Sequence, residues 1–183
     1  MSAVSARLDL QLRHSTLVAG LGVLVAALAF AARAPGAFAF VAAFIAVVLV
    51  VVTATDLDRR IIPNNVVLPA TAIVLCAQIA ISPGRVGHWV VFGCAAAAFF
   101  LVPSLINRSL VGMGDAKLAL LLGVGLGWSV IPALALAFIA LFPVALFTLI
   151  RGGWRARSAT LPFGPFLAFG ALVVLIAPLF TGS

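Results

Sequence analysis

Three of the four acidic residues in this 183-residue chain lie in two short polar clusters at the borders of apolar runs. Asp56 and Asp58 lie in "TDLDRRIIPNN", and Asp115 lies in "VGMGDAKL". Two close carboxyl groups can hydrolyse a peptide bond without a cofactor, because like charges a few ångströms apart share one proton. The ionised group takes a proton from water, and the protonated group polarises the peptide carbonyl. Paired-aspartate chemistry is therefore the first hypothesis.

The elements that must position these residues are membrane helices. The chain is 65% hydrophobic and only 8% charged, which is far from the composition of a soluble domain. Several apolar runs are long enough to cross a bilayer as helices. We expect an all-α, polytopic transmembrane helix bundle of about seven spans, near Thr16 to Ala32, Phe38 to Ala54, Asn65 to Ile81, His88 to Ile106, Lys117 to Trp128, Ile131 to Ile150 and Leu161 to Leu179.

The fifth of these runs, "LALLLGVGLGW", is short and rich in glycine. Small residues let membrane helices approach closely, so we expect this helix to pack tightly on a neighbour. The whole chain, residues 1–183, is interpreted as one integral membrane domain, with a six-span core over residues 37–180 and an additional span within residues 1–36. The first run could instead be a cleaved signal peptide, which would leave the positions of the aspartates unchanged.

The basic residues predict the orientation, because short cytoplasmic loops are enriched in Lys and Arg. With a cytoplasmic amino terminus, only Arg33 and Arg85 lie outside, and nine basic residues lie inside: Arg7, Arg13, Arg59, Arg60, Arg108, Lys117, Arg151, Arg155 and Arg157. Asp56 and Asp115 then both lie at the cytoplasmic border of a cell membrane. The net charge of +7 indicates topology and attraction to anionic lipid, and no nucleic-acid partner is expected.

Each polar residue also has a purely structural interpretation. Asp115 could cap the helix that follows it, and Lys117 could anchor that helix at the interface. Asp56 and Asp58 could pair with the arginines directly after them. Charge at membrane depth is costly, however, and two such clusters on the same side of the membrane favour a functional role.

Three stretches resemble the type IV prepilin peptidases, which are intramembrane aspartyl proteases with a GxGD motif. "GMGDAKL" is similar to that motif, and "DLDRRIIPN" is similar to the family's companion aspartate motif. "LPFGPFLAFG", from Leu161 to Gly170, is similar to the segment that opens the last span. The resemblance covers roughly Val47 to Leu179.

The resemblance implies that Asp56 and Asp115 are the catalytic residues, with Gly112 and Gly114 as the motif glycines. Asp58 matches a variable position and is not assigned to catalysis. Further site-shaping positions follow from the same motifs: Pro63, Asn64, Lys117, Phe163, Gly164 and Pro165. Pro63 suits a first helical turn and Asn64 suits a helix cap. The last three could line the site or only bend the start of the last helix.

The implied reaction is removal of the basic leader from prepilin-like precursors, such as type IV pilins, pseudopilins or Flp-type pilins, at the cytoplasmic face. The partners are then that protein substrate and membrane lipid. No small-molecule cofactor is expected, and no zinc, because Cys76 and Cys94 stand alone in separate spans. Because the sequence has no paired CxxC motifs, it resembles the short, peptidase-only branch of the family. Another protein would then supply any methylation of the substrate.

Helix polarity suggests a division of roles. Asp115 opens a helix, where the positive end favours a carboxylate, and Asp56 closes one, so Asp115 would be the base. Two other classes stay open. One is a presenilin-like GxGD protease, although Thr55 replaces the tyrosine expected there, and Pro132-Ala133-Leu134 follows Asp115 too closely. The other is a proton- or cation-coupled transporter, or an assembly factor, that uses the same aspartates.

Overall fold

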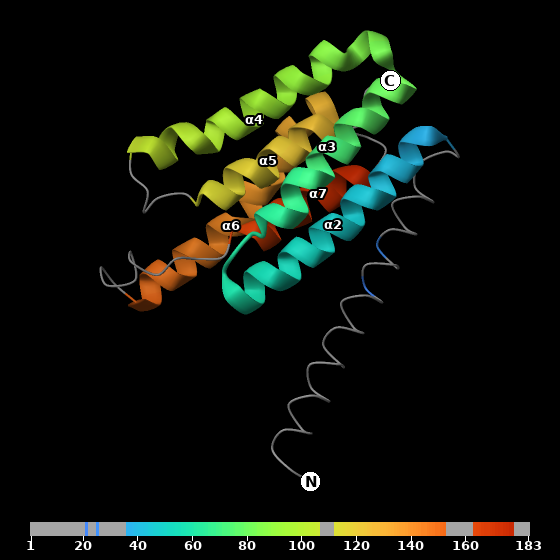
Figure 1. Cartoon of the computed structure of the whole chain (residues 1–183). Coiled ribbons are helices and arrows are strands. Elements are labelled where there is room, and N and C mark those ends of the chain that lie inside the picture. The colour runs from blue at the N-terminus through green and yellow to red at the C-terminus, as the bar shows by residue number, and fades with distance from the viewer. Residues whose placement is uncertain (1–20, 22–24, 26–35, 107–111, 153–162, 178–183) are drawn as a thin grey trace.

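The computed structural model describes residues 21, 25, 36–106, 112–152 and 163–177, and these form α-helices joined by short turns. The helices are α2 (Ala37–Arg59), α3 (Asn64–Ile81), α4 (Val86–Ile106), α5 (Met113–Leu126), α6 (Val130–Gly152) and α7 (Gly164–Ile176), with short 3-10 turns at Pro83–Arg85 and Gly127–Ser129 (Figure 1). The expected span from Thr16 to Ala32 lies outside the described residues, apart from Leu21 and Val25. The all-α prediction is confirmed over the described residues.

The number of spans agrees only in part with the sequence prediction. Four segments of the described residues are long and apolar enough to cross a membrane: Ala37–Arg59, Asn64–Ile81, Pro83–Leu105 and Met113–Thr148. The last of these contains the turn at Gly127, where φ is +57°, and therefore comprises α5 and most of α6. Gly164–Ile176 is a shorter apolar helix. At 1.5 Å per residue, the 14 residues of α5 extend only about 21 Å, which is less than a bilayer core.

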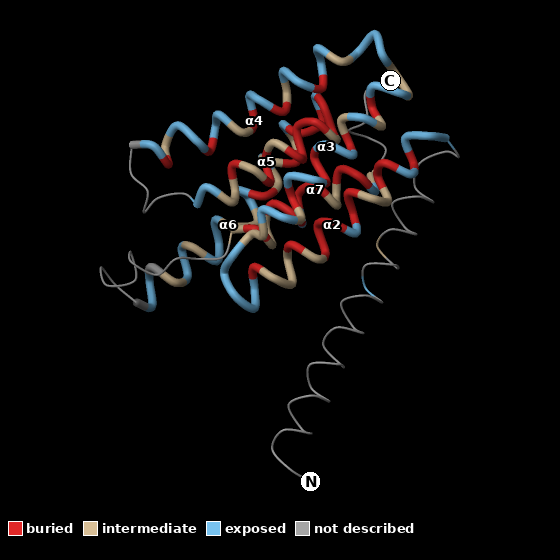
Figure 2. The backbone as a smooth tube through the Cα atoms, in the orientation of Figure 1, coloured by how far each residue is buried: buried red, intermediate tan, exposed pale blue. Residues whose placement is uncertain are grey.

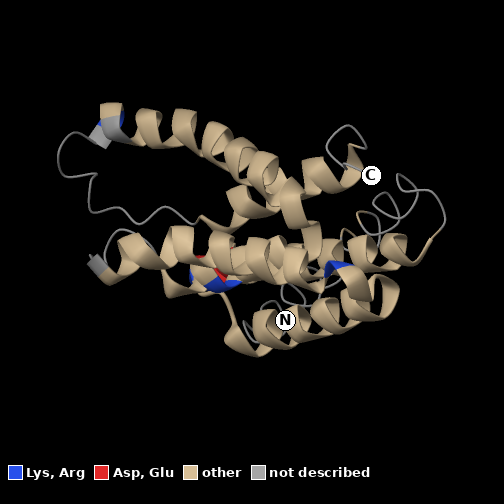
Figure 3. Cartoon of the chain, turned by 90° about the horizontal axis from the view of Figure 1, so that it is seen from above, with Lys and Arg blue, Asp and Glu red and all other residues tan. Residues whose placement is uncertain are grey.

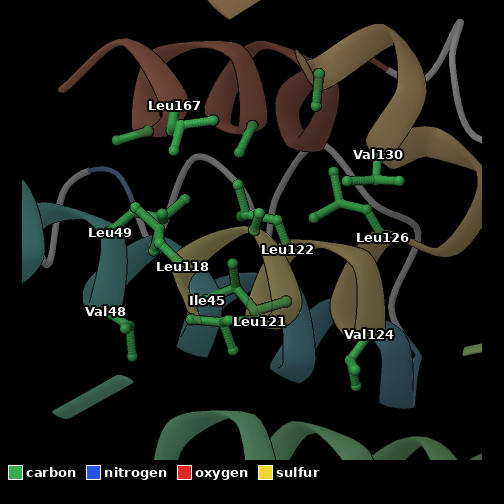
Figure 4. Close-up of a cluster of buried hydrophobic side chains, with 14 of the residues drawn as sticks. Ile45, Val48, Leu49, Leu118, Leu121, Leu122, Val124, Leu126, Val130 and Leu167 are labelled. Atoms are coloured by element: carbon green, nitrogen blue, oxygen red, sulfur yellow. The ribbon is translucent and has the colours of Figure 1, made fainter. Parts of the chain in front are cut away.

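The core forms around α5. This helix packs against α3 and α4, while α7 packs against α6 and α2. Figure 2 shows the buried positions concentrated along α5 and the facing sides of its neighbours. In the close-up of Figure 4, side chains from α2, α5, α6 and α7 meet in one apolar cluster, which includes Ile45, Leu49, Leu118, Leu122, Val130 and Leu167. The helix that carries Asp115 is therefore fixed from several sides.

The outward faces of the bundle carry many large apolar side chains. Large hydrophobic side chains such as Phe40, Ile139 and Phe142 are about two-thirds exposed. A soluble protein rarely exposes so much contiguous apolar surface, whereas lipid solvates it readily. The distribution of these side chains supports the multi-pass membrane interpretation independently of helix length.

The glycines of α5 allow the close packing that the sequence predicts. A Cβ atom added at Gly123 would lie 2.6 Å from the Cα atom of Gly93 and would also collide with the carbonyl of Phe92. Both of these obstacles are backbone atoms of α4, which cannot rotate away. The α4–α5 contact therefore depends on the absence of a side chain at position 123.

We expect Gly123→Ala to destabilise the bundle by about 1–3 kcal/mol, because α4 and α5 must separate to admit the methyl group. Gly87→Ala is the matched control, since a Cβ atom there would meet nothing within 4 Å. Thermal unfolding in detergent would measure both variants. Equal melting temperatures for Gly123→Ala and the wild type would contradict the tight contact.

Candidate active site

Asp56 lies inside the last turn of α2, which continues to Arg59, beyond the predicted end of the span at Ala54. The polar residues after Ala54 contain no glycine or proline, so the helix continues through Asp58 to Arg59. Arg60 ends it by adopting the left-handed conformation, with φ at 53°, and donates its N–H to the carbonyl of Asp56 at 2.8 Å. Asp56 is only 6% exposed, which is unusual for a carboxyl group and requires a hydrogen-bond partner.

That partner is the first residue of α7. The backbone N–H of Gly164 donates to Oδ2 of Asp56 at 3.0 Å, across 108 positions of sequence. The contact needs a glycine, because a Cβ atom at position 164 would lie 2.6 Å from the same oxygen. Phe163 caps α7 and packs its ring against Phe100 and Phe138, with centroids 5.5 and 5.4 Å away. These ring contacts fix the start of α7 against α4 and α6, and so fix the Gly164 donor.

Asp115 lies in the first turn of α5, three residues after the N-cap Gly112. Its carboxylate accepts a hydrogen bond from the backbone N–H of Gly112, which is the acidic half of a capping box. Gly112 and not Asp115 is therefore the N-cap residue, and the structural role of the Asp115 carboxylate is to satisfy the N–H of that cap, which does not exclude a chemical role. Gly114 faces Ile62, and a Cβ atom there would lie 2.9 Å from the Cβ atom of Ile62. Gly114 thus allows α5 to begin against the α2–α3 connection.

The start of α3 differs from the prediction in one detail. Pro63 occupies the N-cap position and Asn64 the first helical position, so the expected capping role of Asn64 is wrong. The Asn64 side chain instead accepts a hydrogen bond from Nζ of Lys117 at 2.9 Å. Two residues that the motifs singled out separately therefore join the starts of α3 and α5.

We expect the Lys117–Asn64 bond to contribute about 0.5–1 kcal/mol, because it is exposed and therefore competes with water. Lys117→Ala and Asn64→Ala should each lower the melting temperature slightly. The double variant should melt no lower than the less stable of the two single variants, because either substitution already removes the hydrogen bond. A double-mutant cycle on thermal unfolding would measure this coupling. Fully additive losses would mean that the two side chains do not interact.

The two aspartates come together although 59 positions separate them. Asp56 is close enough to Asp115 for their charges to interact, and Arg60 is within electrostatic reach of Asp56. Figure 3 shows the acidic positions grouped beside basic ones in an otherwise largely uncharged bundle. Residues from the ends of α2, α5 and α7 therefore form a polar site, with one well-buried carboxyl group and one partly buried one. Such a pair can hold one proton between two acids, as water activation requires.

Helix polarity does not distinguish the roles of the two aspartates. Asp56 closes its own helix, but its carboxyl group also meets the N-terminal end of α7. Each carboxyl group therefore accepts an N–H from the start of a helix, and Arg60 adds a positive charge beside Asp56. The assignment of Asp115 as the base stays a prediction.

Some residues around the site were not singled out in the sequence. Ile62 packs against Gly114, and Phe100 and Phe138 hold Phe163. Ile62 lies within the "DLDRRIIPN" motif, so its place in the sequence could have indicated that it lies near the site. The two phenylalanines gave no signal, because they are ordinary apolar residues in apolar helices. Pro165 follows Gly164 in the first turn of α7, next to the site.

Comparison with known proteins connects this site to a family. The sequence profile of the type IV leader peptidase family matches residues 43–150. The prepilin leader peptidase/N-methyltransferase of Burkholderia pseudomallei is 31% identical over 160 residues, which cover 82% of this chain and 50% of that protein. A protein of the same name from Aeromonas salmonicida is 28% identical over 183 residues, with 96% of this chain and 60% of that protein covered.

A third relative with this name, from Pseudomonas aeruginosa, is 28% identical over 134 residues, which cover 70% of this chain and 46% of that protein. The chain spans about half the length of the curated relatives it matches. No solved structure matches it. The matched range includes both aspartates, Lys117 and the GxGD glycines, and it extends over more than half of the residues, so the chain belongs to the type IV leader peptidase family.

Proposed function

We propose that this chain is a membrane aspartyl endopeptidase that removes the basic leader from prepilin-like precursors at the cytoplasmic face. The observation that carries the proposal is the meeting of Asp56 and Asp115 at the ends of two helices, inside the residues that match the family. Type IV pilins, pseudopilins and Flp-type pilins are the candidate substrates. The excess of basic residues predicted on the same side as the aspartates supports the cytoplasmic orientation.

In the proposed mechanism, one aspartate is ionised and the other is protonated. The carboxylate takes a proton from a water molecule as the water oxygen attacks the peptide carbonyl carbon. The protonated carboxyl group donates its hydrogen to the carbonyl oxygen, which stabilises the tetrahedral intermediate. The C–N bond then breaks, and a proton passes to the departing nitrogen, so that the products are a carboxylic acid and an amine.

The surrounding residues hold this pair in place. The Gly164 N–H orients Asp56, and the Gly112 N–H orients Asp115, so neither carboxyl group must reorganise when a substrate arrives. Burial of Asp56 limits competing water and strengthens the electrostatic interaction with the reacting carbonyl. Lys117 contributes to the site by joining α5 to α3 through Asn64.

The direct test is co-expression of the chain with candidate prepilins, followed by gel shift and mass spectrometry of the precursors. We expect a single cleavage between the basic leader and the apolar helix. If a folded, membrane-inserted chain cleaves none of the candidates, the peptidase proposal is wrong. Proton-coupled flux into liposomes containing the purified chain would then support the transport alternative.

A further inference from the structure

A groove lined mainly by apolar side chains lies along α2 and α7, next to the aspartate pair. Its volume is about 430 Å³. The α2 side consists of Val50, Thr53, Ala54, Leu57 and Asp58. This spacing of three and four residues places all five on one face of the helix. At 1.5 Å per residue, the face extends about 12 Å from Asp58 toward the middle of the apolar span.

The opposite side of the groove comes from α7. Its lining residues are Pro165, Ala168, Phe169 and Leu172, which again share one helical face, and Leu21 and Val25 add two apolar side chains. Pro165 directly follows Gly164, whose N–H binds Asp56. One end of the groove is therefore adjacent to the aspartate pair, and the other end lies deeper in the apolar part of the bundle.

Among the described residues that line the groove, Asp58 is the only charged one. It is exposed, and among the described residues it has no hydrogen-bond or ion-pair partner. It lies two positions after Asp56, so successive rotations of 100° direct the two side chains to different sides of α2. An unpaired carboxylate at the end of an apolar membrane groove is costly, and a cation is its natural complement.

We propose that this groove binds the apolar segment of the peptide substrate and that Asp58 pairs with a basic residue at the end of that segment nearest the scissile bond. The inference rests on the proposed function, because it assigns the substrate of the same site. A peptide in this position would place its basic end at the level of the aspartates and its apolar side chains along α2 and α7. Charge complementarity favours such a peptide over a lipid acyl chain, which has nothing to pair with Asp58.

Photo-crosslinking in the full-length chain would test the groove. A photoreactive amino acid would replace Phe169, which lines the groove and is 51% exposed, in a chain that carries Asp115→Asn to prevent turnover. The same replacement at Ile139, which is 67% exposed on α6 outside the groove, is the control. The probe is a synthetic peptide with two lysines directly before an apolar helix, compared with a peptide in which glutamates replace the lysines.

We expect capture of the lysine peptide at position 169 and not at position 139, with a preference of about tenfold over the glutamate peptide. Asp58→Lys should invert that preference. Equal capture of both peptides, equal capture at the two positions, or capture of lipid alone would overturn the inference.

Cleavage assays separate this inference from the proposed function. Ala54→Phe should fill the groove and raise KM for a prepilin with a smaller effect on kcat, because position 54 lines the groove and two helical rotations of 100° direct its side chain to a different side of α2 from Asp56. If wild-type KM persists in Ala54→Phe and Asp58→Lys, the groove assignment fails and the peptidase proposal stands. If peptide capture follows charge as expected but no prepilin is cleaved, the groove assignment stands and the peptidase proposal fails.

Discussion

Asp56→Asn and Asp115→Asn are each expected to lower kcat/KM for leader cleavage by at least about a thousandfold, because each removes one of the two groups that activate water and the carbonyl. Asparagine has the shape of aspartate and keeps an acceptor oxygen. The Gly164 N–H can therefore still bind position 56, and the Gly112 N–H can still bind position 115. The loss of activity should thus occur without a loss of fold, and mass spectrometry of a co-expressed precursor would measure it.

Arg85→Gln is the matched control, because it also neutralises one charge but lies at the far end of the bundle, in the turn between α3 and α4. It should cleave at the wild-type rate, and all three variants should melt at similar temperatures in detergent. The double variant Asp56→Asn, Asp115→Asn should be no slower than the worse single variant, since groups that act as a unit are not additive. Substantial cleavage by either single variant would exclude the two-acid mechanism.

The sequence predicted the positions of most helices well, because prolines and glycines mark their ends. Pro63 precedes α3, and α4 and α6 begin within two residues of their predicted starts. The end of α2 was harder to predict, since "DLDRR" has the polarity of a loop. The helix nevertheless continues to Arg59 and ends where Arg60 adopts a left-handed backbone, a conformation that no local sequence signal specifies.

The buried faces of the helices could not be predicted in the same way. In a soluble protein, the spacing of apolar residues indicates the inner face. Here the outer faces are also apolar, as Ile139 shows on α6, so hydrophobicity does not distinguish the interior from the lipid side. Glycine was the better signal, because Gly123 and Gly164 both mark places where backbone or carboxyl groups approach closely.

The motifs singled out the two aspartates and Gly164, which the structure brings together, but not Ile62, Phe100 and Phe138 around them and not the contacts among these residues. The Asp56–Gly164 hydrogen bond joins residues 108 positions apart, and it depends on how α7 packs on α2 and α6. The Lys117–Asn64 bond likewise links two motifs that the sequence treats separately. Long-range pairing of this kind follows from tertiary packing, which no single segment encodes.

The Asp56–Gly164 contact leads to the second large expected effect. Gly164→Ala should lower kcat/KM by about a hundredfold, because misplacing a catalytic group by about 1 Å can cost that much. Among the described glycines only Gly127 has a positive φ, so alanine at position 164 is compatible with the backbone, and only the space is lacking. The new methyl group would lie 2.6 Å from Oδ2 of Asp56, and the carboxyl group must move away from its N–H donor.

A series of glycine variants makes this prediction quantitative. A Cβ atom at Gly112 would lie 3.2 Å from Oδ2 of Asp115, so Gly112→Ala should have a smaller effect than Gly164→Ala. Gly87→Ala, which meets no atom within 4 Å, should leave activity unchanged. If the three variants have similar melting temperatures, their cleavage rates should be lowest for Gly164→Ala, higher for Gly112→Ala and highest for Gly87→Ala, in the order of the free space around each position. A Gly164→Ala variant as active as Gly87→Ala would mean that Asp56 does not need the α7 donor, and the position of Asp56 would then have to come from α2 and Arg60 alone.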